Sequence, residues 1–184
     1  MTREQELRRR MTVYYTGDPA RIQHFLKVYE FSLMIGVEEG LSGKELEILG
    51  AAALVHDIGI RPAEEKYGSC DGRLQEQEGP AEAEKMMAAV GYPQEVIARV
   101  SYLVGHHHTY TQIDGADYQI LVEADFLVNL YEGESSRKTI YNTYRKIFRT
   151  EAGRRICRIQ FALEESGGAD LQDAGPGARE GGLS

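Results

Sequence analysis

Two neighbouring residues with metal-ligand side chains, His56 and Asp57, end an apolar stretch of the chain. Apolar residues at helical spacing, together with the capping-box pattern Ser42-Gly43-Lys44-Glu45, predict one helix over residues 44–58. This helix carries almost no charge before the pair, so it should be buried, and burying an aspartate without a partner is costly. A metal ion is the simplest compensating group. A His-Asp pair is also common by chance, so the pair alone is weak evidence for a metal site.

The other histidines lie where they could reach the same site. The chain has five histidines, and His24 falls on a helix predicted over residues 19–39, whose apolar residues form two adjacent stripes. Taken alone, His24 also fits an ordinary buried histidine with one hydrogen bond to the backbone. His106, His107 and His108 follow a later apolar helix, and successive helical positions lie about 100° apart. We therefore expect His107 to reach the site first and His106 next, with His108 in an outer position or at the surface.

Asp125 lies on an apolar helical face that it shares with residues such as Leu121. The helix is predicted to begin at Asp117. An unpaired carboxylate on such a face would be costly, and metal ligation explains it better than any other interpretation. Glu123 and Glu132 lie off this face, so we expect both to be solvated.

The order of these residues resembles that of the HD-domain metal-dependent phosphohydrolases. In this family a histidine on an early helix precedes a His-Asp pair that closes a later helix, and a distal aspartate follows, often with further histidines in between. The chain matches the pattern over roughly residues 21–131, at His24, His56, Asp57, His106, His107 and Asp125. The pair alone is weak, whereas the four-part order is fairly specific.

The resemblance implies an all-α fold, a single-domain bundle of about seven or eight helices with a central metal site. It also implies a divalent metal ion (Mn, Fe, Co, Ni, Zn or Mg) held by His24, His56, Asp57 and Asp125. In such enzymes the metal activates water to attack a small phosphate ester, such as a nucleotide or a related phosphorylated metabolite. Asp57 and Asp125 are the residues expected to take part in catalysis, by accepting a proton or by holding the attacking water.

A second metal ion would need further ligands. Glu78 occupies the position where two-metal members of the family often have a histidine, and together with His107 or His106 it could complete a second site. Glu78-Gly79-Pro80 also has the pattern of a helix start, where a carboxylate is favoured by the helix dipole without any metal. We expect one strongly held metal and a weaker second position.

Basic residues follow the His-Asp pair. The stretch from Arg61 to Gln77 is polar and rich in glycine, which predicts a long active-site loop after a helix that Gly59 and Pro62 terminate. Arg61, Lys66 and Arg73 are candidates for binding substrate phosphate, because forked guanidinium groups and ammonium groups match phosphate oxygens. Taken singly, each could equally be a solvated loop residue.

One position departs from the family pattern. Many members carry a lysine or glutamate three residues after the aspartate of the pair, and this chain has Ile60 there. A general acid at that position is therefore absent. The substrate specificity of the nucleotidase members of the family is accordingly in doubt for this chain. Two other functions remain open: a di-iron oxygenase with a similar ligand array, and a catalytically silent module that binds a nucleotide.

Further helices must complete the fold. They are predicted over residues 4–15, from Pro80 to Val90, from Pro93 to the histidine run, and over 136–150 and 154–163, the last with Ile159 on its apolar face. The domain is expected to cover residues 1–165. Residues 166–184 are rich in glycine and are expected to form a disordered tail whose removal would change little.

Composition limits the classes of partner. The chain has 184 residues, 42% of them hydrophobic, a net charge of -8 and a pI near 5.2. An acidic chain of this kind is not expected to bind nucleic-acid polymers or anionic membranes, which require a basic face. No apolar run is long enough for a membrane span, the first residues lack the apolar core of a signal peptide, and two distant cysteines suggest no disulfide framework. We expect a cytoplasmic protein, and the sequence does not determine its oligomeric state.

Overall fold

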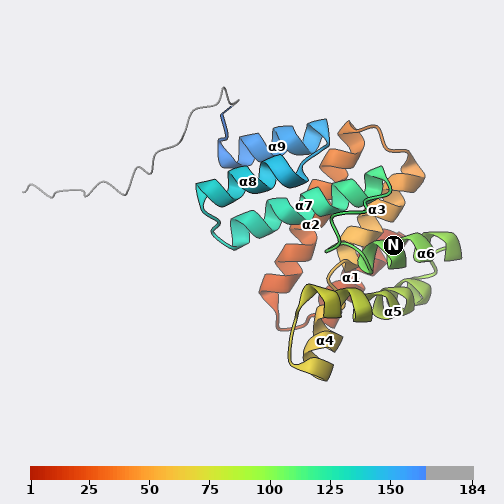
Figure 1. Cartoon of the computed structure of the whole chain (residues 1–184). Helices are drawn as coiled ribbons and strands as arrows, with labels where there is room; N and C mark the ends of the chain where they lie inside the picture. Colours follow the sequence, from red (N-terminus) through yellow and green to blue (C-terminus); the bar gives the residue numbers. More distant parts are fainter. Residues whose placement is uncertain (165–184) are drawn as a thin grey trace, which may run out of the picture.

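The computed structural model describes residues 1–164, and this part of the chain is entirely helical, with nine helices and no strand (Figure 1). This confirms the all-α fold predicted from the sequence. The helices are α1 (Arg3–Tyr14), α2 (Pro19–Glu38), α3 (Gly43–Val55), α4 (Ile60–Tyr67), α5 (Gly72–Val90), α6 (Gln94–Val104), α7 (Ala116–Glu132), α8 (Arg137–Ile147) and α9 (Glu151–Phe161). The predicted tail, residues 166–184, lies outside the described residues. No helix in residues 1–164 is long and apolar enough to cross a membrane.

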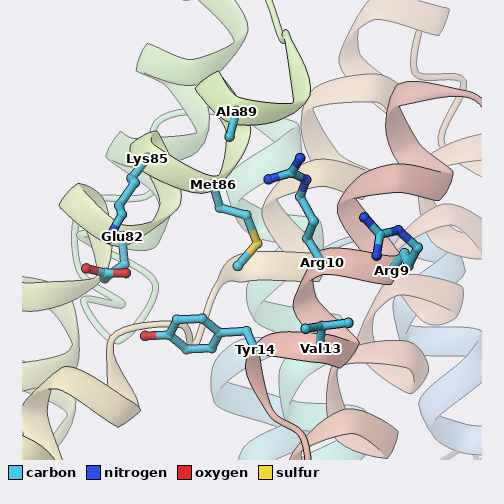
Figure 2. Close-up of a pocket in the computed structure, with 8 residues that line it drawn as sticks. All are labelled: Arg9, Arg10, Val13, Tyr14, Glu82, Lys85, Met86 and Ala89. Carbon is cyan, nitrogen blue, oxygen red and sulfur yellow. The ribbon is translucent and has the colours of Figure 1, made fainter.

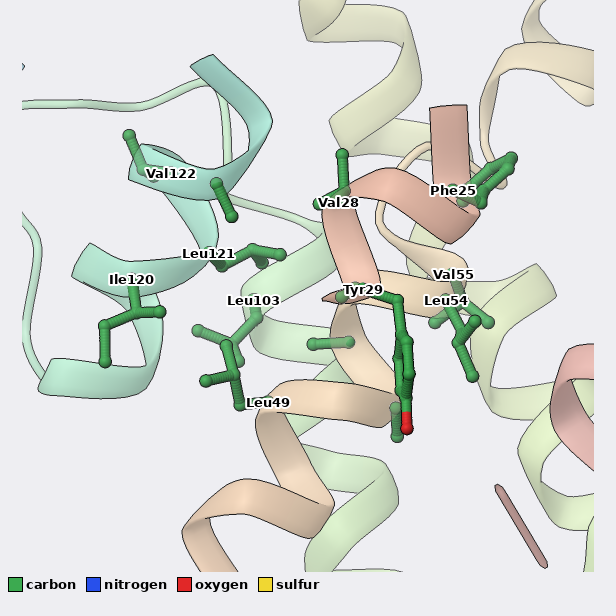
Figure 3. Close-up of a cluster of buried hydrophobic side chains, with 14 of the residues drawn as sticks. Phe25, Val28, Tyr29, Leu49, Leu54, Val55, Leu103, Ile120, Leu121 and Val122 are labelled. Carbon is green, nitrogen blue, oxygen red and sulfur yellow. The ribbon is translucent and has the colours of Figure 1, made fainter. Parts of the chain in front are cut away.

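Helices α2, α3 and α7 form the centre of the bundle, where α2 packs against both of the others. Residues 49–55 of α3 are buried throughout, which agrees with their lack of charge. Phe25, Val28 and Tyr29 of α2 and Leu121 of α7 meet this helix in the core (Figure 3). The remaining helices cover this centre, so the polar residues that α2, α3 and α7 carry at their inner faces must find partners inside the protein.

Local sequence signals explain where several helices begin. The Ser42 side chain accepts a hydrogen bond from the backbone N–H of Glu45, whose carboxylate in turn accepts one from the Ser42 backbone N–H. This is the predicted capping box. Asp18 caps α2 in front of Pro19, as expected for a proline at the first helical position. The start of α7 differs from the prediction: Gly115 is the N-cap, and Asp117 instead binds Arg99.

The prediction of a long active-site loop after the His-Asp pair is wrong. Residues 60–67 form α4, and α5 begins at Gly72, so that most of the stretch is helical. Pro62 is the third residue of α4, a position where a proline has no helical hydrogen bond to lose, and Gly59 has φ −69° rather than a left-handed conformation. The polar composition reflects the exposed side of these helices.

The helix start predicted at Glu78-Gly79-Pro80 is also wrong. Pro80 lies inside α5, which runs from Gly72 without interruption, so Glu78 is in the middle of a helix and has no favourable interaction with a helix N-terminus. Gly79 allows α5 to approach α6 closely, because a Cβ atom at Gly79 would lie 2.6 Å from the Val104 side chain. Small residues at this crossing thus bring the end of α6 close to α5.

Two further expectations about burial fail. Glu123 is fully buried rather than solvated, and Ile159, expected on an apolar face, is 73% exposed. The two cysteines form no disulfide, as expected: Cys70 is exposed and Cys157 is buried.

Candidate metal centre

The His-Asp pair lies in the turn between α3 and α4. Helix α3 ends at Val55, and residues 56–59 form a turn before α4 begins at Ile60. His56 is fully buried, and its Nδ1–H donates a hydrogen bond to the Ala53 carbonyl at 2.9 Å. Tyr15, at the end of α1, donates from its hydroxyl to the Asp57 carbonyl at 3.2 Å. The turn is therefore held by contacts from two helices.

The imidazoles of His24 and His56 meet the carboxylates of Asp57 and Asp125. The Nε2 atoms of His24 and His56 lie 3.2 Å apart. Asp125 Oδ1 lies 3.2 Å from the His24 Nε2 atom and 3.5 Å from that of His56. Asp57 Oδ2 lies 3.7 and 3.6 Å from the same two nitrogens. Helices α2, α3 and α7 thus bring together the four residues that the family resemblance implied as ligands of one metal.

The other oxygen of Asp57 faces a second pair of histidines. Asp57 Oδ1 lies 2.9 Å from His107 Nε2 and 3.8 Å from His108 Nε2. Asp57 therefore stands between two groups of ligand-type atoms, one with His24 and His56 and the other with His107 and His108.

Hydrogen bonds at the far side of three imidazole rings determine which nitrogen faces the centre. His56 Nδ1–H donates to Ala53, His107 Nδ1–H donates to the Val104 carbonyl at 2.9 Å, and His24 Nδ1–H donates to the Glu132 carboxylate at 2.9 Å. In the neutral ring the proton on Nδ1 leaves the lone pair on Nε2. When all three rings are neutral, as metal ligation requires, their lone pairs point toward the two aspartates.

A further observation fits a metal ion. Asp125 Oδ1 is buried and accepts no hydrogen bond within residues 1–164. A buried carboxylate oxygen without a donor is unfavourable unless a cation compensates it. Imidazole nitrogens with carboxylate oxygens form the mixed donor set typical of divalent transition metals. The residues present therefore fit a metal ion.

The electrostatics of the cluster couple its acids and bases. Burial lowers the pKa of His24, but the neighbouring Asp125 and Asp57 carboxylates outweigh burial and raise this pKa to about 9. Burial raises the pKa of Asp57, yet the nearby His56 and His107 lower it to about 2. The pKa of Asp125 is held well below its usual range, since His24 and His56 outweigh its burial. Both carboxylates are thus ionised at neutral pH.

Glu132 binds the far side of the His24 ring, a contact that the sequence analysis missed, although Glu132 is exposed as expected. Its Oε2 accepts the bond from His24, and its Oε1 accepts one from Lys27 at 2.9 Å. Glu132 follows Asp125 by seven residues on α7, which is about two helical turns, so both side chains point to the same side of the helix. This spacing was the available signal.

The histidine run is arranged differently from the prediction. Helix α6 ends at Val104, so the three histidines lie in a turn and are not limited to helical spacing. His107 reaches Asp57 as expected. His106, expected next, instead stacks on the Tyr102 ring at 4.2 Å and bonds to the Tyr102 carbonyl, while His108 is the second ring beside Asp57.

The structure does not bring Glu78 to the metal cluster. Its carboxylate accepts hydrogen bonds from the Lys66 ammonium group and, at 2.9 Å, from the Tyr67 hydroxyl. This arrangement joins α4 to α5. Glu78 is not among the ligand-type groups that converge within the described part of the chain.

The three basic residues proposed to bind phosphate lie on α4 and α5. Arg61 bonds to Glu65 at 3.0 Å and to the Tyr14 carbonyl at 2.8 Å, so it is held at the end of α1. Lys66 is paired with Glu78. Arg73 is exposed at the start of α5. To bind Arg61 or Lys66, a substrate phosphate would therefore have to compete with the carboxylate that each residue already contacts.

Comparisons with known proteins agree with the fold. The model of the HD domain family matches residues 21–147. The chain is similar to the crystal structure of a predicted HD superfamily hydrolase from an uncultured Thermotogales bacterium, with 25% sequence identity and a TM-score of 0.62. The similarity covers 86% of this chain and 84% of that chain. No curated protein matches the chain.

Proposed function

The chain belongs to the HD-domain family, and from this membership we propose that it is a metal-dependent phosphohydrolase acting on a small phosphate ester. A nucleotide or a related phosphorylated metabolite is the proposed substrate class. The observation that carries the proposal is the convergence of three imidazole Nε2 atoms on Asp57 and Asp125, with each Nδ1 already engaged elsewhere.

The residues of the cluster have distinct proposed roles. His24, His56, Asp57 and Asp125 would hold the ion, which when bound would act as a Lewis acid toward water and a phosphoryl oxygen. Both carboxylates are ionised at neutral pH because their pKa values are lowered, so either can accept a proton from the attacking water.

Protonation of the leaving group has no obvious donor. The family position for such an acid is Ile60, the first residue of α4. The partly exposed His108 lies 3.8 Å from Asp57 Oδ1, and its ring also contacts Gln75 at 3.2 Å. We propose that water or a substrate group supplies this proton, which favours esters whose leaving group is already a weak base.

A screen of phosphorylated metabolites tests the reaction. Metal-free protein would be reloaded separately with Mn²⁺, Co²⁺, Ni²⁺, Fe²⁺, Zn²⁺ or Mg²⁺, and the release of inorganic phosphate measured. We expect release with at least one combination, and its loss in Asp57→Asn, which keeps the side-chain shape and removes the charge. If no substrate released phosphate with any metal, the proposal would be wrong.

The number of metal ions is a separate question. We propose one strongly held ion with His24, His56, Asp57 and Asp125, and a weaker position between Asp57, His107 and His108. Glu78, expected from the sequence to serve the second ion, is engaged by Lys66 and Tyr67. Elemental analysis should therefore find unchanged metal content in Glu78→Gln and a reduced content in His107→Ala. A reduced metal content in Glu78→Gln would instead support Glu78 as a ligand of the second ion, as expected from the sequence.

The shared aspartate also favours a second candidate, a di-iron oxygenase. Two metal positions that share one carboxylate are a suitable arrangement for a pair of redox-active ions, and the histidine-rich donor set accepts iron. Aerobic purification followed by metal counting and optical spectroscopy separates the two functions. Two iron ions per chain, with a spectrum that changes on reduction and on exposure to oxygen, would favour the oxygenase.

A further inference from the structure

A groove of about 410 Å³ lies between α1 and α5, and none of the metal-centre residues lines it (Figure 2). Helix α5 lines it with side chains at positions i, i+3, i+4 and i+7, which form one continuous face. Helix α1 lines it with residues from two successive turns. The groove is thus built by regular helices and not by a loop.

The base of the groove is apolar. Met86 of α5 and the ring of Tyr14 from α1 face each other across it, with Val13 and Ala89 on either side (Figure 2). Val13 is 59% exposed, so it adds apolar surface that faces solvent at the groove. A ligand with an apolar body would remove this surface from water.

The rim of the groove carries an excess of positive charge. Arg9 and Arg10 both bind the same carboxylate, that of Glu6, with bonds of 2.7 to 2.9 Å. Lys85 and Glu82 stand on the opposite rim. Three cations against two carboxylates leave one positive charge, in a chain whose net charge is -8.

We propose that this groove is a binding site for a small amphipathic anion. The ligand class is an aromatic or acyl body that carries a single anionic group, such as a carboxylate, sulfonate or phosphate. The apolar body lies against Met86 and Tyr14. The anionic group is bound by Arg10, whose bond to Glu6 within the described residues uses only its Nε, and Lys85 on the opposite rim adds positive potential. The volume falls within the range of sites for small organic ligands. The site is independent of the phosphohydrolase proposed above.

The probe that tests this site is 8-anilinonaphthalene-1-sulfonate, an aromatic monoanion whose fluorescence rises in an apolar environment. Titration of the folded, metal-free protein should show saturable binding of one dye per chain. The uncharged N-phenyl-1-naphthylamine serves as the matched probe without the anionic group. Use of metal-free protein prevents the sulfonate from binding to a metal ion.

Two kinds of variant locate the site: one removes positive charge from the rim, and the other fills the groove with a larger side chain. Arg10→Gln/Lys85→Gln should weaken binding of the sulfonate about 10-fold, since each exposed cation contributes a few-fold, and should leave the uncharged dye unchanged. Ala89→Trp, at an exposed helical position, should fill the groove and weaken both dyes. Lys138→Gln, an exposed lysine on α8, is the control and should change neither.

Circular dichroism must show that each variant is folded, because partly unfolded proteins also bind this dye. Equal affinity of the sulfonate for the wild type, the double variant and Ala89→Trp would place the dye elsewhere and overturn the proposal. Binding that is lost equally for both dyes in the double variant would show an apolar groove without anion recognition. A dimer that dissociates when the dye binds would assign the groove to a second copy of the chain and also overturn the proposal.

Discussion

Glu132 shows how one residue outside the ligand set can control it. The carboxylate accepts the Nδ1–H of His24 and is itself held by Lys27. Such a partner keeps the imidazole in the tautomer and orientation that present Nε2, and its loss typically lowers metal affinity. The histidine thus depends on two residues, one on its own helix α2 and one on α7.

Glu132→Ala should therefore weaken metal binding about 10- to 100-fold without unfolding the protein. Calorimetric titration with Mn²⁺ or Zn²⁺ measures the affinity. ¹⁵N NMR of the His24 ring in metal-free protein, recorded above the His24 pKa of about 9 so that the ring is neutral, reports the tautomer. Glu132→Gln keeps an acceptor oxygen and should recover part of the affinity. Glu30→Ala, at an exposed position of α2, is the control. An unchanged affinity and tautomer in Glu132→Ala would refute the positioning role.

At the scale of the elements, the turn between α3 and α4 is fixed by a close backbone crossing. A Cβ atom at Gly59 would collide with the Gln75 carbonyl and lie 2.8 Å from the Gly79 backbone nitrogen, both on α5. The backbone of Gly59 is in the right-handed region, so the requirement for glycine is one of space. The same turn carries His56 and Asp57.

Gly59→Ala should accordingly lower the free energy of unfolding by about 1–3 kcal/mol, the usual cost of overpacking, and should reduce metal affinity as the turn shifts. Urea unfolding and metal titration measure the two effects. Gly43→Ala is a matched control, because a Cβ there meets nothing within 4 Å and alanine favours the helix. Equal stability of both variants would mean that α5 moves aside freely.

A buried carboxylate joins α7 to the start of α9. Glu123 accepts hydrogen bonds from the backbone N–H groups of Arg149 and Thr150, at 2.6 and 3.0 Å, and from the Gln119 amide at 2.7 Å. The Thr150 hydroxyl donates to it as well. A carboxylate with this many donors is stable in the interior, and it closes the bundle on the side of the last two helices.

Glu123→Ala should leave these donors without an acceptor and cost ~3 kcal/mol of stability, because buried groups that lose a charged partner are strongly destabilising. Chemical unfolding of the variant measures the loss. Glu84→Ala, an exposed glutamate of α5, should change stability by less than about 0.5 kcal/mol. A small effect in Glu123→Ala would imply that water replaces the carboxylate.

At the scale of the whole molecule, the metal centre joins α2, α3 and α7 with the histidine turn after α6. A ligand that binds the folded state alone stabilises it by mass action, by ~2.7 kcal/mol at a free concentration 100 times the dissociation constant. Bringing an ion into this centre should therefore stabilise the entire bundle and not one helix.

Chelation should lower the melting temperature by about 5–10 °C for a domain of this size. Thermal unfolding followed by circular dichroism, with and without added metal, measures the shift. Asp57→Ala removes the carboxylate shared by both ligand groups, so its melting temperature should be insensitive to metal and its metal content low. Full metal occupancy in Asp57→Ala would contradict the assigned centre.

The sequence by itself determined the helical class and the four residues that meet at the centre. Helical periodicity and caps such as Ser42 are local properties, and charged residues on apolar faces, such as Asp125, indicate an internal partner whatever the arrangement of the helices. The order of His24, His56-Asp57 and Asp125 along the chain also indicated the family. The α-helical period placed His24 and Asp125 on inner faces, whereas His56 and Asp57 lie in the turn after α3.

Only the tertiary structure decided which other residues surround them. His108 replaces His106 beside Asp57 because α6 ends before the run, and Glu78 lies away from the cluster because α5 continues through Pro80. The sequence did not show the partners of Glu123 and Glu132, because most of their donors come from α2 and from the segment between α8 and α9. Helix ends and long-range hydrogen bonds depend on packing between distant segments, which a local pattern does not contain.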